Sequence, residues 1–485
     1  MYKTAFAFAM VLGCTAFAFG EVAQPTAAEK AHFPSSDCSA EGAPQGTTRL
    51  YIALTNGKDG SGASMADARD GSTVTRFDTI LRCYSEGCTE KQSSGAAVAK
   101  TENLIVCLGP GTFWTLGTYD YLIAVPHPNP AGFTIGKGWK IHGSGKDMTV
   151  VKLSDYLPIT DPKNPQNLPV NSGTGLVFGT NSDNAPGIEI SDLTIDGNYP
   201  VLKSRARQNG IKVLTLDAIH LRSDLGGHHI HDVNVIKSAA EIGGLSPRWE
   251  AFPIWILSVD RSKPGQDRDN MIENVSMSQS ACVLCTAICV ANATAEVKNN
   301  VVEGFQIAYG GWDLAGGSFH DNTAINDDYG FNIDSLVNNG VTIERNKIIH
   351  PRRFGFVLGG GGTFADFKFL DNTVQVDKSG VIGFVLQGNV TRAVIAGNKV
   401  LADNSSGARS TAFKIYSASQ SGPNRDNIYQ SNQIIDGMSL VFRAPSQKAQ
   451  NCFFDNRDER GNPRKDMPEN RGGACVADPR KAASH

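Results

Sequence analysis

The sequence has little charge, few aromatic residues and no dense run of basic residues. Charged residues make up 19% of the 485 residues, aromatic residues make up 8%, and the formal net charge is −3. A nearly neutral chain without a basic cluster argues against nucleic acid as a partner. The composition also differs from that of a disordered chain or of a protein that is membrane-embedded throughout.

The apolar stretch AFAFAMVLG lies within the first 20 residues and is too short to span a bilayer. Lys3 precedes it, and Ala18 and Gly20 follow with the spacing of a cleavage site. We therefore expect residues 1–20 to be a signal peptide, no membrane span in the rest of the chain, and a secreted or periplasmic protein. A loose lipoprotein box that ends at Cys14 leaves lipid anchoring open as a minor alternative.

The second half of the chain carries asparagine at a nearly fixed interval of 22 to 34 residues, each time within the same short apolar frame. A repeat of this length with strand patterns and no helical period is typical of a solenoid. The asparagine amide suits a sharp bend between two strands and can hydrogen-bond to its equivalent in the next coil. The sequence predicts an all-β, right-handed parallel β-helix. The repeated asparagines are Asn274, Asn300, Asn322, Asn346, Asn372, Asn398, Asn432 and Asn456.

Domain boundaries follow from this repeat, since a solenoid grows along one axis without a second core. Residues 21–48 are rich in Ala, Pro, Ser and Gly and are expected to be a linker. We expect the β-helix over residues 49–455 and a polar tail over 456–485. Phe77, Ile80 and Leu81 have the spacing of a short helix, which would cap the open N-terminal end of the solenoid.

Export permits disulfides, and nine cysteines follow Gly20. Cys83 with Cys88, and Cys452 with Cys475, are the expected pairs. Cys282, Cys285 and Cys289 form C-x2-C-x3-C, but no fourth metal ligand lies nearby in the sequence. We therefore interpret these three as core thiols or as one bridge and its neighbour.

Three early segments carry a resemblance. They are LGPGTF (108–113), IHGSGKDMTVVKL (141–153) and ISDLTIDGN (190–198). Together they resemble the opening coils of pectate-lyase-like β-helix proteins, which are mostly secreted polysaccharide lyases, hydrolases and epimerases. The resemblance covers roughly residues 50–455. It implies that a polysaccharide lies along the outer face of one sheet.

A third strand in each coil supplies that face, because strand side chains alternate between inside and outside. If Ile219 and Leu221 point inward, the outward residues of this strand series follow from the same phase. As substrate-binding residues we expect His220, Arg222, Asn332, Gln387, Lys414 and Tyr416. By coil count, His220 lies about 19 Å and Lys414 about 14 Å from Asp334, so each would contact a different sugar.

The densest group of functional side chains lies between residues 309 and 353. Tyr309 and Trp312 lie in YGGWD, interpreted as a glycine-flanked loop, and both are expected to bind substrate. Trp312 could stack on a sugar ring. Asp313, Asp334, Arg352 and Arg353 are the candidate catalytic residues. An aspartate with a raised pKa would supply an acid, and an ionised neighbour a base or nucleophile.

YGFNID (329–334) loosely resembles a strand of mannuronan epimerases, although Asn332 stands in place of their aspartate. This resemblance implies only that the coil faces the sugar. Asp217, in DAI, resembles a calcium-binding aspartate of pectate lyases, so Ca²⁺ is the one cofactor left open. A single carboxylate is too few for calcium.

His228, His229 and His231 form a second group in GGHHIHD. Alternation places His229 and His231 on one side of the strand. A metal site would need both imidazoles and a carboxylate such as Asp217. Hydrogen bonding along the solenoid is the preferred interpretation, and no metal ligand is assigned.

The function expected from these features is action on an extended, acidic polysaccharide by lyase or epimerase chemistry. Arg352 and Arg353 would neutralise the uronate carboxylate while the neighbouring proton is removed. The G-H-G and R-I-K elements of polygalacturonase-type hydrolases are absent, as is the R-x-P-x-x-R element of pectate lyases. Two alternatives stay open: a non-catalytic glycan-binding or scaffold β-helix, and a hydrolase with paired aspartates. The polysaccharide and the oligomeric state are not predicted.

Overall fold

The computed structural model describes most of the chain between Phe33 and Met467. The described residues are 33–39, 47–88, 98–118, 132–155, 172–180, 185–211, 213–242, 251–258, 260, 266–279, 285–334, 337–360, 362–404, 409–415, 424–434, 439–442 and 450–467. Ala31–His485 forms one compact unit. The predicted signal peptide, with Cys14, lies outside the described residues and stays a prediction. No helix within the described part of the chain is long and apolar enough to cross a membrane.

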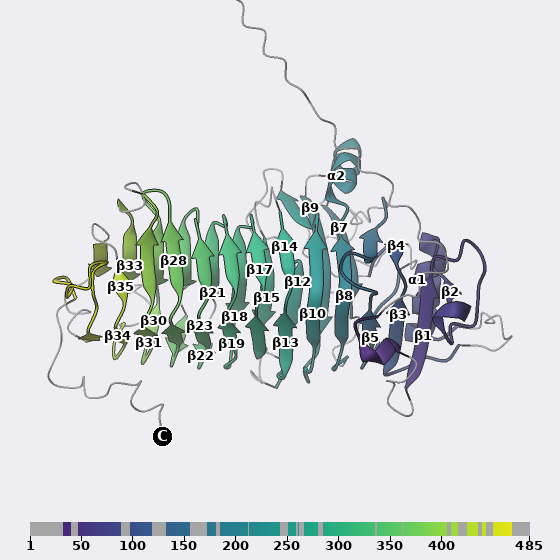
Figure 1. The fold of residues 1–485 in the computed structure, drawn as a ribbon, viewed down its shortest axis with the longest axis horizontal. Helices are drawn as coiled ribbons and strands as arrows, with labels where there is room; N and C mark the ends of the chain where they lie inside the picture. The colour runs from purple at the N-terminus through teal and green to yellow at the C-terminus, as the bar shows by residue number, and fades with distance from the viewer. Residues whose placement is uncertain are drawn as a thin grey trace, which may run out of the picture. The chain divides into compact units, whose positions relative to one another are not determined.

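The described strands between Thr48 and Phe454 wind through successive coils, and apart from β11 they pair in parallel with neighbouring strands. A typical coil has one strand before a sharp bend, a second strand after it, and a third strand farther on. Thus β16 pairs with β19, β17 with β20 and β18 with β21. Figure 1 shows these strands side by side from the purple N-terminal to the yellow C-terminal coils. The predicted right-handed parallel β-helix is confirmed.

The strands fall into three series. The first is β1 (Thr48–Ala53), β3 (Leu104–Leu108), β5 (Lys140–His142), β8 (Glu189–Asp196), β10 (His229–Ile236), β13 (Asn270–Glu273), β16 (Ala295–Lys298), β19 (Ser318–His320), β23 (Thr342–Glu344), β27 (Lys368–Leu370), β31 (Val394–Ala396), β34 (Ile428–Gln430) and β37 (Cys452–Phe454). The second is β4 (Gly111–Thr115), β6 (Thr149–Leu153), β14 (Ser276–Ser278), β17 (Val301–Glu303), β20 (Thr323–Ile325), β24 (Lys347–Ile349), β28 (Thr373–Val376), β32 (Lys399–Ala402) and β35 (Gln433–Ile434), with β8 and β10 running through both.

The third series is β7 (Ser172–Gly179), β9 (Val213–Arg222), β12 (Ile254–Leu257), β15 (Thr286–Ala291), β18 (Ile307–Trp312), β21 (Tyr329–Asp334), β25 (Phe354–Leu358), β29 (Ile382–Leu386), β33 (Thr411–Ile415) and β36 (Ser439–Phe442). β11 (Ala239–Ile242) pairs antiparallel with β9. β22 (Val337–Asn339), β26 (Thr363–Ala365) and β30 (Asn389–Thr391) form a short separate sheet. α2 (Tyr199–Gln208) follows β8.

Buried asparagines stack at the bend between the first and second series. The backbone N–H and the Nδ2 of Asn322 both donate to Oδ1 of Asn346, at 3.0 Å each, and Asn346 donates in the same way to Asn372. The ladder runs through Asn300, Asn322, Asn346, Asn372, Asn398, Asn432 and Asn456. The prediction that Asn274 belongs to this ladder is wrong, because the ladder position in its coil is residue 275. Asn274 takes the left-handed conformation (φ 54°) that precedes the ladder position, where Val275 stands.

Aromatic residues also stack inside the solenoid, because residues of the same kind lie over one another when successive coils keep one register. Tyr309, Phe331, Phe356, Phe384 and Phe413 form a continuous internal stack, with ring centroids 4.8 to 5.0 Å apart. These rings are all buried. They fix which strand residues point inward and therefore which point to solvent.

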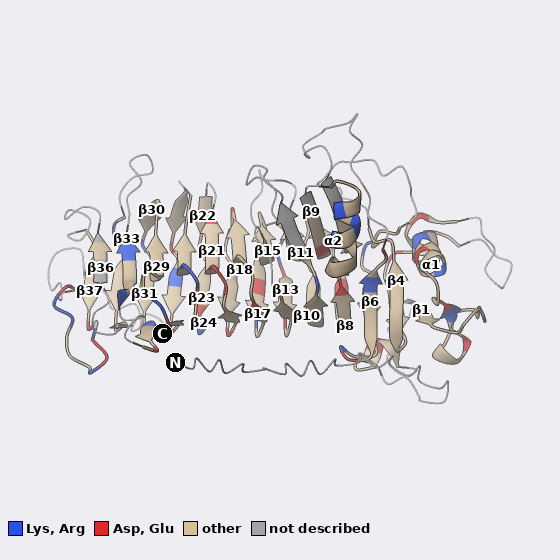
Figure 2. Ribbon diagram, turned by 90° about the horizontal axis from the view of Figure 1, so that it is seen from above, with Lys and Arg blue, Asp and Glu red and all other residues tan. Residues whose placement is uncertain are grey.

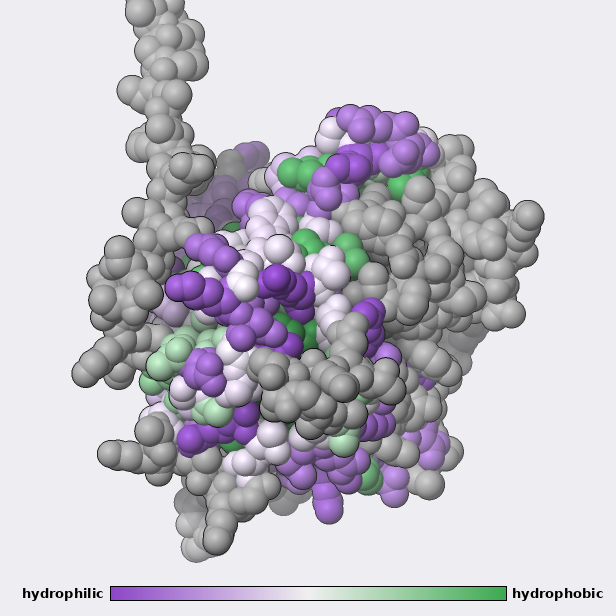
Figure 3. Space-filling view, turned by 90° about the vertical axis from the view of Figure 1, so that its right-hand side faces the viewer, coloured by the Kyte–Doolittle hydropathy of each residue, from purple (hydrophilic) through white to green (hydrophobic). Residues whose placement is uncertain are grey.

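The predicted helical cap is α1 (Val74–Glu86), which begins after Thr73 and buries Phe77, Ile80 and Leu81. It packs against β4 and β2 (Arg69–Asp70). Seen from this end, the visible described surface is mainly polar with small apolar patches (Figure 3). The short helices η1 (Ser36–Cys38) and η2 (Met65–Asp67) lie nearby in the sequence.

Disulfides secure this end of the chain. The predicted Cys83–Cys88 pair is confirmed. Cys38 is bonded to Cys107, which ties η1, within the segment expected to be a linker, to β3. Cys285 and Cys452 are also disulfide-bonded, which favours the bridge over a metal site at the cysteine motif. The expected partner Cys475 lies outside the described residues. Such pairing is typical of proteins in oxidising compartments.

The asparagine ladder generates a stability prediction. Asn346→Ala removes hydrogen bonds to Asn322, Phe319 and Asn372 and leaves buried donors and acceptors without partners. We expect it to lower the free energy of unfolding by about 2–4 kcal/mol, measured by urea denaturation. Asn339→Ala, at an exposed asparagine of β22, is the matched control. Equal stability of the two variants would contradict the role assigned to the ladder.

Candidate functional site

The outer face of the third series carries two rows of side chains. The first row, in register across successive strands, is His220, Trp255, Cys289, Gly310, Asn332, Val357, Val385, Lys414 and Val441. The second begins Arg222, Leu257, Ala291, Trp312 and Asp334. The predicted outward phase is therefore confirmed for His220, Arg222, Asn332, Asp334 and Lys414, and Gln387 follows β29 directly. Tyr416 lies outside the described residues.

Three aromatic rings meet on this face. The ring centroids of Phe252 and Trp255 are 4.7 Å apart, those of Phe252 and Trp312 are 5.4 Å apart, and those of Trp255 and Trp312 are 5.6 Å apart. All three side chains are half-buried. The strand positions between Trp255 and Trp312 carry only Cys289, Ala291 and Gly310, so no long side chain separates the rings. We call Phe252, Trp255 and Trp312 the aromatic cluster.

Asp217 and His220, on the preceding strand β9, hold Phe252 and Trp255 in place. The backbone N–H of Phe252 donates to Oδ1 of Asp217 at 2.9 Å, and Nε2 of His220 lies 2.8 Å from the carbonyl oxygen of Phe252. The imidazole also meets the ring of Trp255 edge-on, with centroids 5.3 Å apart. His220 is only 8% exposed, so it supports the aromatic cluster and has little surface for a ligand.

Asp334 and Asn332 lie one strand beyond Trp312. Asp334 is the register partner of Trp312, and Asn332 is that of Gly310. Both side chains lean toward the following coil: a Cβ on Gly360 would lie 1.8 Å from Oδ1 of Asp334, and one on Gly359 would lie 3.2 Å from Oδ1 of Asn332. Gly360, which has φ 70°, therefore leaves the space that the Asp334 carboxylate occupies.

Tyr309 does not reach this face. Residues 307–312 are strand β18 and not the loop that the glycines suggested. Tyr309 is fully buried, and its hydroxyl lies 2.9 Å from the carbonyl oxygens of Asn300 and Thr323. The prediction that it contacts substrate is wrong, because its ring belongs to the internal aromatic stack.

The structure separates the predicted catalytic residues into two groups. Asp313 and Asp334 lie at the C-terminal ends of β18 and β21, where Oδ1 of Asp313 accepts from the N–H of Val337. Arg352 and Arg353 precede β25, whose Phe354 pairs with Tyr329 at the start of β21. Five residues of extended strand span about 17 Å, so the arginines and Asp334 do not share one centre.

The arginines have other partners at their edge of the sheet. Arg352 pairs with Asp328 at 2.6 Å, and the guanidinium of Arg353 lies 5.4 Å from the ring centroids of both Tyr329 and Phe354. Both arginines are exposed. Figure 2 shows charged residues scattered along the coils and not gathered into one block.

Asp327 has the raised pKa expected of an acid, but it points into the solenoid. Burial raises the pKa of its carboxyl well above the ordinary value, against the opposing effects of the Phe305 N–H and the charge of Arg352. Oδ1 accepts from Phe305 at 2.6 Å, and the residue is 1% exposed. A polysaccharide on the outer face cannot reach it.

This burial generates a pH prediction. Because burial raises the pKa of Asp327 above that of the unfolded chain, the folded state holds this proton to a higher pH, and the unfolding free energy contributed by this group falls as pH rises above about 4. Asp327→Asn should flatten this slope, measured by urea unfolding between about pH 4 and pH 8. Asp328→Asn, at its partly exposed neighbour, should keep the slope of the parent protein. Parallel slopes for the parent and Asp327→Asn would contradict the assignment.

The histidine group lies on a different sheet. His229 and His231 point to the outer face of the first series, and their ring centroids are 4.1 Å apart. Their carboxylate neighbour is Glu189, the register partner of His229, whereas Asp217 lies beneath the aromatic cluster. Burial by itself would lower the pKa of His231, but hydrogen bonds to Glu189 and Asp232 raise that pKa to about 9. His228 is buried, and burial lowers its pKa to about 3.

Sequence reasoning missed Phe252, Trp255 and Glu189. The signal for Trp255 was present, because the phase that places His220 outward in DAIHLR also places Trp255 outward in PIWILS. Phe252 precedes its strand, and its position depends on Asp217 and His220 in the preceding coil. Glu189 is 40 residues from His229 and becomes its neighbour only through the register of β8 and β10.

No protein-family model and no curated protein matches the sequence. Among solved structures, the chain is similar to the A-module of mannuronan C-5 epimerase AlgE4 from Azotobacter vinelandii, at 14% identity over 81% of this chain and 98% of that one, with a TM-score of 0.42. It is similar to a family 28 exopolygalacturonase from Yersinia enterocolitica, at 11% identity over 84% and 76%, with a TM-score of 0.46.

A third similar structure is a mannuronic acid-specific polysaccharide family 6 lyase from human gut microbiota, at 12% identity over 87% and 92%, with a TM-score of 0.45. The assignment of the fold rests on the strand pairing described above, which agrees with the pectate-lyase-like resemblance of the opening coils. No specific family is identified.

Proposed function

We propose that this chain is an exported protein that binds an extended, acidic polysaccharide on the outer face of the third series and acts on it by lyase or epimerase chemistry. The observation that carries the proposal is the aromatic cluster of Phe252, Trp255 and Trp312. Partly exposed rings beside small residues offer an apolar platform on which a sugar ring can stack. A protein gains little from leaving part of two tryptophan rings open to water on one face unless a ligand covers them.

The arrangement of polar groups favours a long and negatively charged ligand. Arg222 lies on β9 and Lys414 on β33, seven strand steps apart, or about 34 Å at the spacing of parallel strands. The aromatic cluster, Asp334 and Gln387 lie between them. Cations at both ends of the face would attract a polyuronate, and the intervening groups would each contact a different sugar.

Asp334 is the group we propose for the reaction. Its carboxylate lies beside the aromatic cluster, where it can accept the proton next to the uronate carboxyl group, the first step of both elimination and epimerisation. In elimination the electron pair then expels the glycosidic oxygen, which takes a proton from solvent water. In epimerisation solvent water returns a proton to the carbon from its other face. Arg352 and Arg353 are excluded from this step by their position at the opposite edge.

The first test concerns binding. Trp255→Ala and Trp312→Ala should each weaken retention in gels that contain mannuronan or polygalacturonan by about tenfold, because each removes one stacking surface. Trp114→Ala is the matched control: this tryptophan is 37% exposed and lies on β4, outside the third series. Loss of retention in the control, or none in the other two, would remove the aromatic cluster as the platform.

The second test concerns turnover. Asp334→Asn should lower the rate at which the active polymer is converted by at least about 10²-fold while binding stays within a few-fold, because only the proton acceptor is lost. Ultraviolet absorbance of unsaturated uronate ends reports elimination, and exchange of solvent deuterium into the polymer reports epimerisation. Arg353→Ala should retain full turnover, and a matching loss there would contradict the separation of the two groups.

The alternatives give different results in the same assays. A non-catalytic glycan binder would be retained by the gel and lost on Trp312→Ala, with no product from any polymer. A hydrolase that uses Asp313 and Asp334 would release reducing ends without unsaturation.

A further inference from the structure

We propose that Glu189, His229 and His231 bind a divalent transition metal of the zinc class on the outer face of the first series. This surface belongs to a different sheet from the aromatic cluster. The proposal is therefore independent of the proposed function.

The backbone brings the three ligands together. His229 and His231 are two residues apart on β10 and so lie on the same face, and Glu189 on β8 is paired directly with His229. One ligand atom from each residue lies within 4.8 Å of the others. Oε1 of Glu189 and Nε2 of His231 are 3.2 Å apart, close to the separation of about 3.4 Å between tetrahedral ligands of one zinc ion.

Each imidazole has a second carboxylate behind it. Nε2 of His229 lies 2.9 Å from Oε1 of Glu273, and Nδ1 of His231 lies 3.0 Å from Oδ2 of Asp232. Nε2 of His231, the opposite nitrogen of that ring, faces Oε1 of Glu189, so a metal ion would replace the hydrogen bond between these two ligands. Histidine ligands of zinc commonly donate their other N–H to a carboxylate in this way, which fixes the tautomer and the ring orientation.

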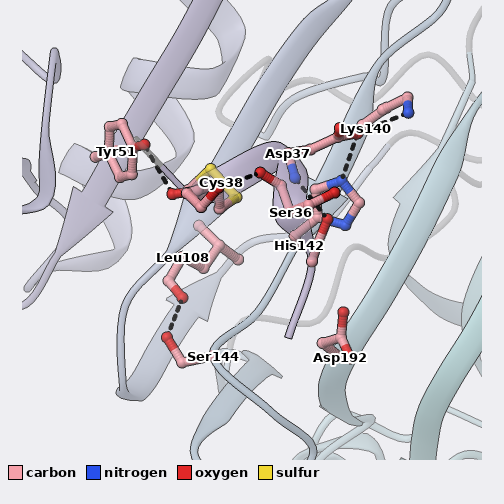
Figure 4. The surroundings of a disulfide bond; sticks show 12 residues. Ser36, Asp37, Cys38, Tyr51, Leu108, Lys140, His142, Ser144 and Asp192 are labelled. Atoms are coloured by element: carbon pink, nitrogen blue, oxygen red, sulfur yellow. Dashed lines mark hydrogen bonds and ion pairs between the residues drawn. A yellow bond between two sulfur atoms is a disulfide. The ribbon is translucent and has the colours of Figure 1, made fainter. Parts of the chain in front are cut away.

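A separate observation also points to a cation beside Glu189. His142 is fully buried, and its Nε2 has no hydrogen-bond partner among the described residues. That nitrogen lies 4.0 Å from Oε1 of Glu189 and 3.6 Å from Oδ2 of Asp37. Figure 4 shows His142 beside Asp37, next to the Cys38–Cys107 disulfide.

The tautomer of His142 follows from its other contact. Oγ of Ser191 donates to Oδ2 of Asp192 at 2.6 Å, which uses its only proton, so Ser191 accepts from Nδ1–H of His142 at 2.8 Å. With its proton on Nδ1, a neutral ring presents the Nε2 lone pair toward the carboxylate oxygens of Asp37 and Glu189, an arrangement that a cation beside Glu189 relieves.

The side chains around the site carry more negative than positive charge, which favours binding of a cation. Four carboxylates lie on or beside it, and two ammonium groups face them. The carboxylates are Asp37, Glu189, Asp232 and Glu273, and the ammonium groups are those of Lys140 and Lys298.

Two imidazoles and a carboxylate form a ligand set that zinc prefers. Calcium, by contrast, needs six or more oxygen ligands. The chemistry of the donors therefore commits the site to a zinc-class ion and not to calcium.

The test uses the full chain, stripped with a chelator and titrated with Zn²⁺ by calorimetry and with Co²⁺ by visible absorption. We expect one equivalent to bind, with the absorption bands of a tetrahedral cobalt site. His229→Ala, His231→Ala and Glu189→Gln should each weaken binding by at least about 100-fold, and Glu273→Gln by about tenfold. His320→Ala is the matched control, because His320 pairs with Glu296 and Asp321 on the same sheet and forms no metal-binding group with a second imidazole among the described residues.

Circular dichroism and the melting temperature establish that each variant is folded, and His229→Gln and His231→Gln replace any alanine variant that is not. The absence of saturable binding would overturn the proposal, as would an equal loss in His320→Ala. Binding that survives His229→Ala but is lost in His142→Ala would move the cation to the pocket of Asp37 and His142, and would overturn it as well.

Discussion

The structure depends on the hydrogen-bonded register between successive coils. Within the ladder, Asn346 accepts two hydrogen bonds from Asn322 of the preceding coil, donates two to Asn372 of the next coil, and donates one back to the carbonyl oxygen of Phe319. Because these groups are buried, a slip of one residue would leave several of them without partners, at a cost of about 1–3 kcal/mol each. Like positions therefore stack on like positions, both in the internal aromatic stack and on the outer faces. Because like positions stack, the number of strands between two side chains on one outer face gives the distance between them along the solenoid.

Much of this could be read from the sequence. The asparagine interval predicts the coil, and the alternation in DAIHLR, YGFNID and TAFKIY predicts which residues of the third series point outward. The exception, Asn274, is instructive. A residue in the left-handed conformation precedes each ladder position, and asparagine suits that conformation as well as it suits the ladder. Sequence alone does not distinguish two adjacent positions that both favour the same residue type.

The errors at the candidate site have a different cause. Counting coils gives the distance along the solenoid axis but not the position along each strand. Arg353 and Asp334 are one coil apart by that count, yet they lie at opposite ends of neighbouring strands. Tyr309 was misplaced because the glycines after it suggest a loop, whereas Gly310 is a strand residue whose Cβ would clash with the methyl group of Thr286, 2.5 Å away. For Arg353 and for Tyr309 alike, the sequence pattern does not show at which residue the strand begins.

The outer faces of the first and third series differ in how many coils contribute to the site on each. On the third series, small residues between Trp255 and Trp312 let rings from different coils converge, so the surface they form spans several coils. On the first series, Glu189 and His229 belong to adjacent coils and to one register pair. In a solenoid, stability is approximately a sum over neighbouring coils. A metal bound there would strengthen the single interface between β8 and β10. From β18 onward the rows on the third series would keep their spacing, because the asparagine ladder sets that spacing coil by coil without any ligand.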